Sequence, residues 1–121
     1  MPRPRSIVLA ALLGSAVGLA ACGSSSHSSP AASSGVVRIA YRNYAAHPED
    51  LTVKVGTTLV WTNDDAGVDH NVTSEGQSVE HLASASLATG QSFSVKLNTP
   101  GVIDYECTFH PFMTGRITVV E

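Results

Sequence analysis

The chain has 121 residues, with 7 Lys or Arg against 10 Asp or Glu and a net charge of −3 at pH 7. This length allows one domain, and the acidic balance excludes the basic patch of a nucleic-acid-binding protein, so we expect no nucleic-acid partner. Charged residues are 14% and hydrophobic residues 43% of the chain, which excludes a disordered polyelectrolyte. Two cysteines are too few for a disulfide-rich scaffold or a four-cysteine zinc site.

The N-terminal segment is expected to be an export signal rather than part of the fold. Arg3 and Arg5 precede an uncharged apolar run over residues 7–21, a pattern typical of a secretory signal peptide. The run is shorter than the roughly 20 residues of a membrane span. Because it ends in Leu-Ala-Ala-Cys, which resembles the bacterial lipoprotein cleavage box, we predict a lipoprotein signal peptide over residues 1–21 and lipidation of Cys22. An uncleaved anchor and an ordinary signal peptide are alternatives.

The segment behind the signal, residues 22–35, is rich in Gly and Ser and has no apolar periodicity, which predicts a flexible tether. The folded domain is then residues 36–121. Without Arg3 and Arg5, five basic and ten acidic residues remain, a net charge of −5. Cys107 is the one cysteine of this domain, so it has no disulfide partner there. A lone thiol in an oxidising compartment needs protection, which a bound metal would provide.

The domain is expected to be all-β. Apolar side chains alternate along short segments separated by Gly, Pro, Asn and Asp, and this pattern predicts a β-sandwich or barrel of about seven to eight strands. Residues 74–87 are ambiguous between loop, strand and short helix. The expected strands cover residues 36–44, 51–55, 58–63, 69–73, 91–97, 102–107 and 115–120.

One set of side chains predicts metal chemistry. Cys107, His110 and Met113 recur at intervals of three residues in a predicted turn between two strands, and His70 lies 37 residues before the cysteine. A thiolate, two imidazoles and a thioether are the ligands of a blue copper site, in which two His and one Cys surround the ion and a Met is a weak axial ligand. We therefore predict one copper ion bound by these four residues.

Other interpretations of the same residues are weaker. A lone buried Cys is usually a small apolar residue, and a lone Met usually fills a core. Cys107 and His110 could form a nucleophile pair, but no oxyanion-stabilising or orienting residue is evident. A structural zinc site would favour two Cys and two His and would not use Met.

The chain resembles the small blue copper proteins, the cupredoxins, and among them the amicyanin and plastocyanin branch. The resemblance covers roughly residues 48–121, and the short Cys-x-x-His-Pro-Phe-Met loop is similar to that of amicyanin. Residues that carry the resemblance are PEDLTVKVG at 48–56, VWTN at 60–63, HNV at 70–72, DYECTFHPFM at 104–113 and GRITVVE at 115–121.

The resemblance implies a Greek-key β-sandwich with copper at one end and one-electron transfer as the activity. His70, Cys107 and His110 would then be equatorial ligands, and Met113 the axial ligand. In the family the first histidine is buried and the second lies at the solvent edge. His110 would therefore be the port for electrons, in a docking patch formed by Pro111 and Phe112.

Three further residues are expected around the ligands. The family implies that Asn71 ties the loop of the first histidine to the loop of the cysteine, and Thr108 is the natural partner. Phe109 replaces the proline that amicyanin-like loops usually carry. Since Phe109 has a backbone N–H and proline has none, we expect this amide to donate to the Cys107 sulfur and to raise the reduction potential.

The expected function is that of a lipid-tethered electron carrier outside the cytoplasm, anchored to a membrane through Cys22. It would be a monomer that cycles between Cu(I) and Cu(II) and meets other redox proteins transiently. No enzymatic activity is expected, because copper oxidases and nitrite reductases need further copper centres and domains. An extracytoplasmic copper-binding or copper-delivery protein is the alternative, and an adhesion module with an unused cysteine is a third possibility.

Overall fold

The computed structural model describes residues 32–121, so the predicted signal peptide, Cys22 and most of the predicted tether lie outside the described residues. Within the described residues the chain forms eight strands in two four-stranded sheets. The strands are β1 (Val36–Arg42), β2 (Ala45–His47), β3 (Asp50–Lys54), β4 (Thr58–Asn63), β5 (Thr73–Glu75), β6 (Ser92–Lys96), β7 (Gly101–Cys107) and β8 (His110–Val120). No helix long and apolar enough to cross a membrane occurs between residues 32 and 121.

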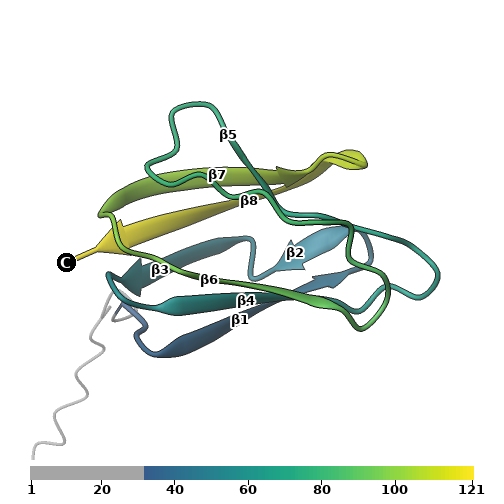
Figure 1. Cartoon of the computed structure of the whole chain (residues 1–121), viewed down its shortest axis with the longest axis horizontal. Helices are drawn as coiled ribbons and strands as arrows, with labels where there is room; N and C mark the ends of the chain where they lie inside the picture. The colour runs from purple at the N-terminus through teal and green to yellow at the C-terminus, as the bar shows by residue number, and fades with distance from the viewer. Residues whose placement is uncertain (1–31) are drawn as a thin grey trace, which may run out of the picture.

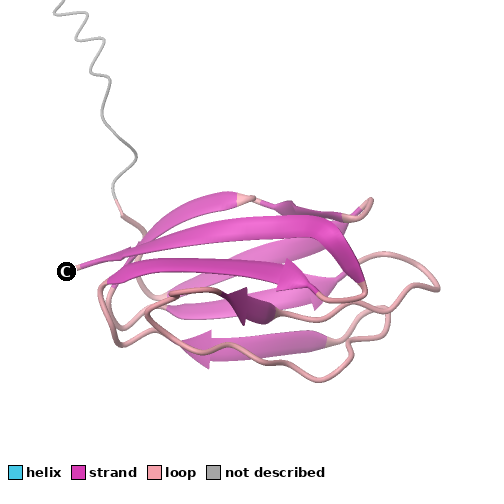
Figure 2. Ribbon diagram, turned by 90° about the horizontal axis from the view of Figure 1, so that it is seen from above, coloured by secondary structure: helices cyan, strands magenta, loops and turns pink. Residues whose placement is uncertain are grey.

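The two sheets pack face to face, as Figures 1 and 2 show from two directions. One sheet has the order β2-β1-β4-β6 and the other β3-β8-β7-β5. The pairs β1–β4 and β3–β8 are parallel, so the connecting segments cross from one sheet to the other. The expected β-sandwich is confirmed.

The core follows from the alternation along the strands. In β4, Leu59 and Trp61 point inward and are fully buried. In β7, the fully buried inward residues are Ile103, Tyr105 and Cys107. The ring of Trp61 lies edge-on to that of Tyr105, with centroids 5.4 Å apart. Burying aromatic side chains of this size supplies much of the hydrophobic stabilisation of a small domain.

Several predicted element boundaries were wrong. The segment 36–44 is interrupted by a turn at Asn43 and Tyr44, so Ala45–His47 forms a separate strand, β2. In place of the strand expected at 69–73, the structure has β5 at Thr73–Glu75. Strand β8 begins at His110, five residues before the expected start at Gly115. Ser33, inside the predicted tether, pairs with Val53, because its backbone N–H and C=O bond to Thr52 and Lys54 at the edge of β3.

The two ends of the sandwich differ in what they carry. The β7–β8 turn lies at one pole, while the C-terminus and the start of the described chain lie at the opposite pole (Figures 1 and 2). Side chains that end β7 and begin β8 are therefore presented far from the point where the chain enters the fold.

Candidate metal centre

Three metal-binding side chains converge at the pole of the β7–β8 turn. Nδ1 of His70 and Nδ1 of His110 each lie 3.8 Å from Sγ of Cys107, and the three donor atoms all lie within 4.8 Å of one another. His70 and Cys107 are fully buried, and His110 is half-buried. No other group of three His, Cys, Asp or Glu donors is this compact in the part of the chain that the structure describes.

The spacing of these donors fits one metal ion. Bond lengths of about 2.3 Å to sulfur and about 2.0 Å to imidazole nitrogen, set at a trigonal angle of about 120°, give a sulfur–nitrogen distance of about 3.7 Å. Both observed distances of 3.8 Å are close to this value. Met113 is only 1% exposed, belongs to the same core cluster as Cys107, and follows His110 by three residues in β8.

Secondary structure holds each donor in place. Cys107 is the last residue of β7, and His110 the first of β8, and the two pair directly across the turn formed by Thr108 and Phe109. A β-bulge between Glu106 and Cys107 shifts the register at this point. His70 lies in the loop after β4, where two backbone hydrogen bonds of 3.0 and 2.7 Å join it to Leu87.

Asn71 connects the two segments that carry the buried donors. Its side chain donates to Oγ1 of Thr108 at 2.7 Å and accepts from the backbone N–H of Thr108 at 2.8 Å. Its backbone N–H points at Sγ of Cys107 at 3.4 Å, and its C=O accepts from the hydroxyl of Tyr41 at 3.1 Å. Burial, with smaller effects from Tyr105 and Cys107, raises the pKa of Tyr41, so this hydroxyl keeps the proton that it donates.

Asp65 is a site residue that the sequence did not reveal. Its Oδ2 lies 2.8 Å from Nε2 of His70, on the side of the ring away from Cys107. With Nδ1 facing the sulfur, Nε2 carries the proton and donates to the carboxylate, which fixes the tautomer and the ring orientation. Burial acts to raise the pKa of Asp65, but hydrogen bonds from Tyr44, His70 and Asn43 outweigh it and hold the pKa below its ordinary value.

The side chains around His110 form an exposed apolar surface. Phe112 is 70% exposed and Pro111 is also exposed, and the ring of Phe112 lies 6.0 Å from that of His110. Phe109 is 51% exposed at the tip of the turn.

The expected hydrogen bond from the amide of Phe109 to Cys107 is absent among residues 32–121. The backbone amide that bonds to this sulfur is that of Asn71, which belongs to a different segment. Phe109 lies in the two-residue turn, where the chain reverses direction between Cys107 and His110, while the sulfur points into the core.

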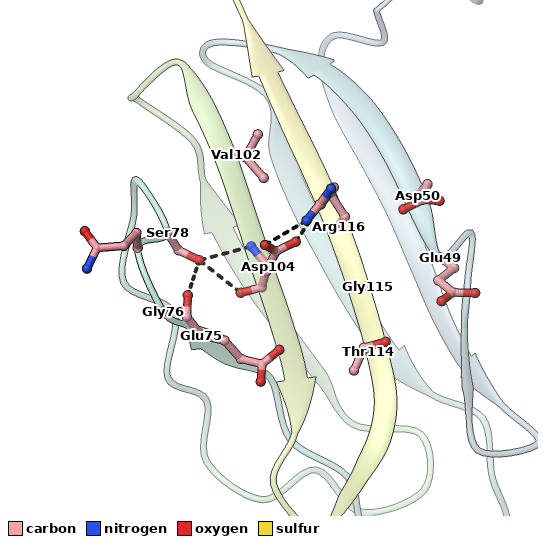
Figure 3. A pocket seen from close by; sticks show the side chains of 11 residues that line it. Glu49, Asp50, Glu75, Gly76, Ser78, Val102, Asp104, Thr114, Gly115 and Arg116 are labelled. Carbon is pink, nitrogen blue, oxygen red and sulfur yellow. Dashed lines mark hydrogen bonds and ion pairs between the residues drawn. The ribbon is translucent and has the colours of Figure 1, made fainter.

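A second concave region lies apart from these donors. A groove of about 770 Å³ runs over the outer face of β7 and β8 and is lined by acidic residues that include Glu49, Glu75 and Asp104 (Figure 3). Arg116 crosses it and forms two hydrogen bonds with Asp104, at 2.7 and 3.1 Å. None of the three metal donors lines this groove, so it is a surface feature distinct from the metal centre.

The sequence and the fold are similar to those of known proteins. The family model of the cupredoxin-like domain matches residues 12–119. The chain belongs to the cupredoxin-like family. Amicyanin-alpha of Methylorubrum extorquens is 42% identical over 72 residues, which cover 58% of this chain and 60% of that protein. Plastocyanin of Scenedesmus fuscus is 35% identical over 82 residues, which cover 60% of this chain and 83% of the relative.

Solved cupredoxin structures superimpose on most of the domain. A purple cupredoxin from Nitrosopumilus maritimus is 35% identical with a TM-score of 0.63, and the match covers 69% of this chain and 99% of that one. Together, the family and the three converging donors identify the cofactor of this cupredoxin as one type 1 copper ion.

Proposed function

We propose that this cupredoxin is a blue copper electron carrier, exported and tethered outside the cytoplasm by a lipid on Cys22. The observation that carries the proposal is the convergence of His70, Cys107 and His110 at one pole, with two of the donors buried and the third half-buried. Bound there, copper would supply a one-electron couple between Cu(I) and Cu(II). The curated relatives, amicyanin and plastocyanin, support the copper electron-carrier part of this proposal.

His70, Cys107, His110 and Met113 are the residues that would hold the copper ion. The protein holds them by braces that do not depend on the metal, namely the Asn71–Thr108 pair and the Asp65–His70 bond. A preformed donor set that keeps its shape when the charge changes lowers the cost of each electron transfer.

Electrons would enter and leave at His110. Of the four residues that would hold the ion, His110 alone has access to solvent, and Pro111 and Phe112 next to it expose apolar surface. A small apolar contact suits the brief, weak encounters of redox proteins, which bury less than about 1,200 Å². We therefore propose transient redox proteins as the partners, and we further propose that the carrier works as a monomer and catalyses no reaction itself.

Copper delivery is the alternative function, and voltammetry combined with a transfer assay separates the two. An electron carrier gives a reversible one-electron couple and keeps its copper when a Cu(I) chelator is added in modest excess. A delivery protein releases Cu(I) to the chelator within the time of mixing. Rapid release, or an irreversible couple, would contradict the carrier function.

A further inference from the structure

The turn between β1 and β2 has an unusual residue at its second position. Arg42 pairs with Ala45, so Asn43 and Tyr44 form a two-residue hairpin loop with φ angles of 52° and 57°. Turns of this type favour Asn followed by Gly, because both residues adopt the left-handed conformation. Tyr44 therefore occupies a glycine position, and a bulky residue is kept in such a conformation only where the surroundings impose it.

Asp65 supplies that constraint. One carboxylate oxygen accepts from the backbone N–H of Asn43 at 2.6 Å, and the other accepts from the backbone N–H of Tyr44 at 3.0 Å. The second oxygen is also the partner of Nε2 of His70 at 2.8 Å. Asp65 is held in turn by Asn63, whose side-chain oxygen accepts from its N–H at 2.9 Å. A single carboxylate thus joins the turn to a buried metal donor.

The turn places the Tyr44 ring against both histidines. The ring centroid lies 4.9 Å from that of His110 and 5.7 Å from that of His70, and both pairs are edge-to-face, at 83° and 80°. This geometry is the favourable one for aromatic pairs. The side chain is 41% exposed, so Tyr44 lies between the two imidazoles and the solvent.

We propose that Asp65 and Tyr44 are positioning residues of the metal centre. Asp65 orients the His70 ring through Nε2 and fixes the β1–β2 turn. The turn in turn packs the Tyr44 ring against His70 and His110, so that the two imidazole rings are in place before metal binds. The copper-related consequence rests on the proposed function: Tyr44 shields the two imidazoles from water, and an apolar cover of this kind raises the reduction potential by disfavouring the more highly charged Cu(II) state.

The first test needs no copper. In purified copper-free protein, NMR should detect an Overhauser effect between the ring protons of Tyr44 and His110, and slow hydrogen exchange at the Tyr44 amide. In Asp65→Ala the Overhauser effect should disappear and the amide should exchange at least about tenfold faster, since the hydrogen bond from this amide to a charged acceptor is lost.

Asp64→Ala is the matched control, because it removes the same charge one residue away and its exposed side chain has no hydrogen bond in the structure described here. This variant should retain both signals. Persistence of the Overhauser effect and of slow exchange in Asp65→Ala, or equal losses in both variants, would overturn the positioning role.

A second variant distinguishes an effect of the Tyr44 ring on the reduction potential from an effect on folding. Tyr44→Gly relieves the left-handed strain in the turn, which offsets part of the loss of the two ring contacts, so the variant should still unfold in one cooperative thermal transition. The reduction potential of its copper-loaded form should be lower, and Tyr44→Phe, which retains the ring, should restore the wild-type value. An unchanged potential in Tyr44→Gly would overturn the shielding role. A wild-type protein that forms no blue copper site would instead contradict the proposed function, whatever the copper-free NMR result.

Discussion

Asn71 shows how much a single side chain can contribute to the metal centre. Two hydrogen bonds join it to Thr108, and the residue is nearly buried. Replacing it in Asn71→Ala leaves the Thr108 amide without its partner, so we expect the copper-free protein to lose about 2 kcal/mol of unfolding free energy. Urea denaturation of wild type and variant measures this difference.

Asn98→Ala is the control for this substitution, because Asn98 is exposed and its side chain makes one hydrogen bond of 3.2 Å to Lys96. Its unfolding free energy should change by no more than about 0.5 kcal/mol. Equal losses in the two variants would mean that Asn71 does not brace the site.

The residues of the site differ in how well the sequence predicts them. Cys107, His110 and His70 are chemically distinctive, and the spacing of the first two in a predicted turn indicates a common site. Asp65 gives no such signal, since it lies in a polar loop beside Asp64. Its partners Asn43 and Tyr44 are more than 20 residues away and reach it only through the pairing of β1 with β2 and β4.

The hairpin of β7 and β8 is the element that presents most of the donors, and its close packing depends on Gly115. Gly115 pairs with Tyr105, and a Cβ at this glycine would overlap the Tyr105 ring. Gly115→Ala must therefore shift the ring or the strand, which costs about 1–3 kcal/mol in a packed core. We expect its thermal midpoint to fall by at least about 4 °C in a domain of this size.

Thr114→Ala tests the neighbouring position of the same strand, where the side chain is exposed. Its midpoint should stay within about 2 °C of the wild type, because exposed substitutions have small effects. If Gly115→Ala were as stable as Thr114→Ala, the close contact between Tyr105 and β8 would not exist in solution.

At the scale of elements, alternation predicts strands but not their limits. The residues of β4 and β7 alternate cleanly and match the predicted segments closely. Residues 74–87 do not alternate, and they form β5 followed by a loop that side chains hold, such as the Ser78 hydroxyl bonded to the backbone of Asp104. The early start of β8 depends on pairing with β7, which the sequence of His110–Thr114 alone does not indicate.

For the whole molecule, the start of the described chain and the metal centre lie at opposite poles. The described chain begins at the pole opposite the β7–β8 turn (Figure 1), so a lipid on Cys22 would leave the metal centre accessible to partners. In cells, Cys22→Ser should move the protein from the membrane fraction to the soluble extracytoplasmic fraction, because the substitution removes the proposed site of lipid attachment. Immunoblots of fractionated cells measure this distribution.

Cys107→Ser is the control, since it removes the other cysteine and should leave the protein in the membrane fraction. Wild-type protein found in the soluble fraction would contradict lipid anchoring, and so would an unchanged distribution of Cys22→Ser.

Titration of the copper-free protein with Cu(II), followed by visible absorption and EPR, shows whether the Cys107 thiolate binds copper, because both spectra report on the bond between sulfur and the ion. We predict an intense blue or purple absorption that saturates at one copper per chain, with the narrow copper hyperfine splitting of a type 1 site. Cys107→Ser should lack this absorption. A colourless wild-type protein, or a Cys107→Ser variant that is coloured to the same extent, would contradict a type 1 copper site at Cys107.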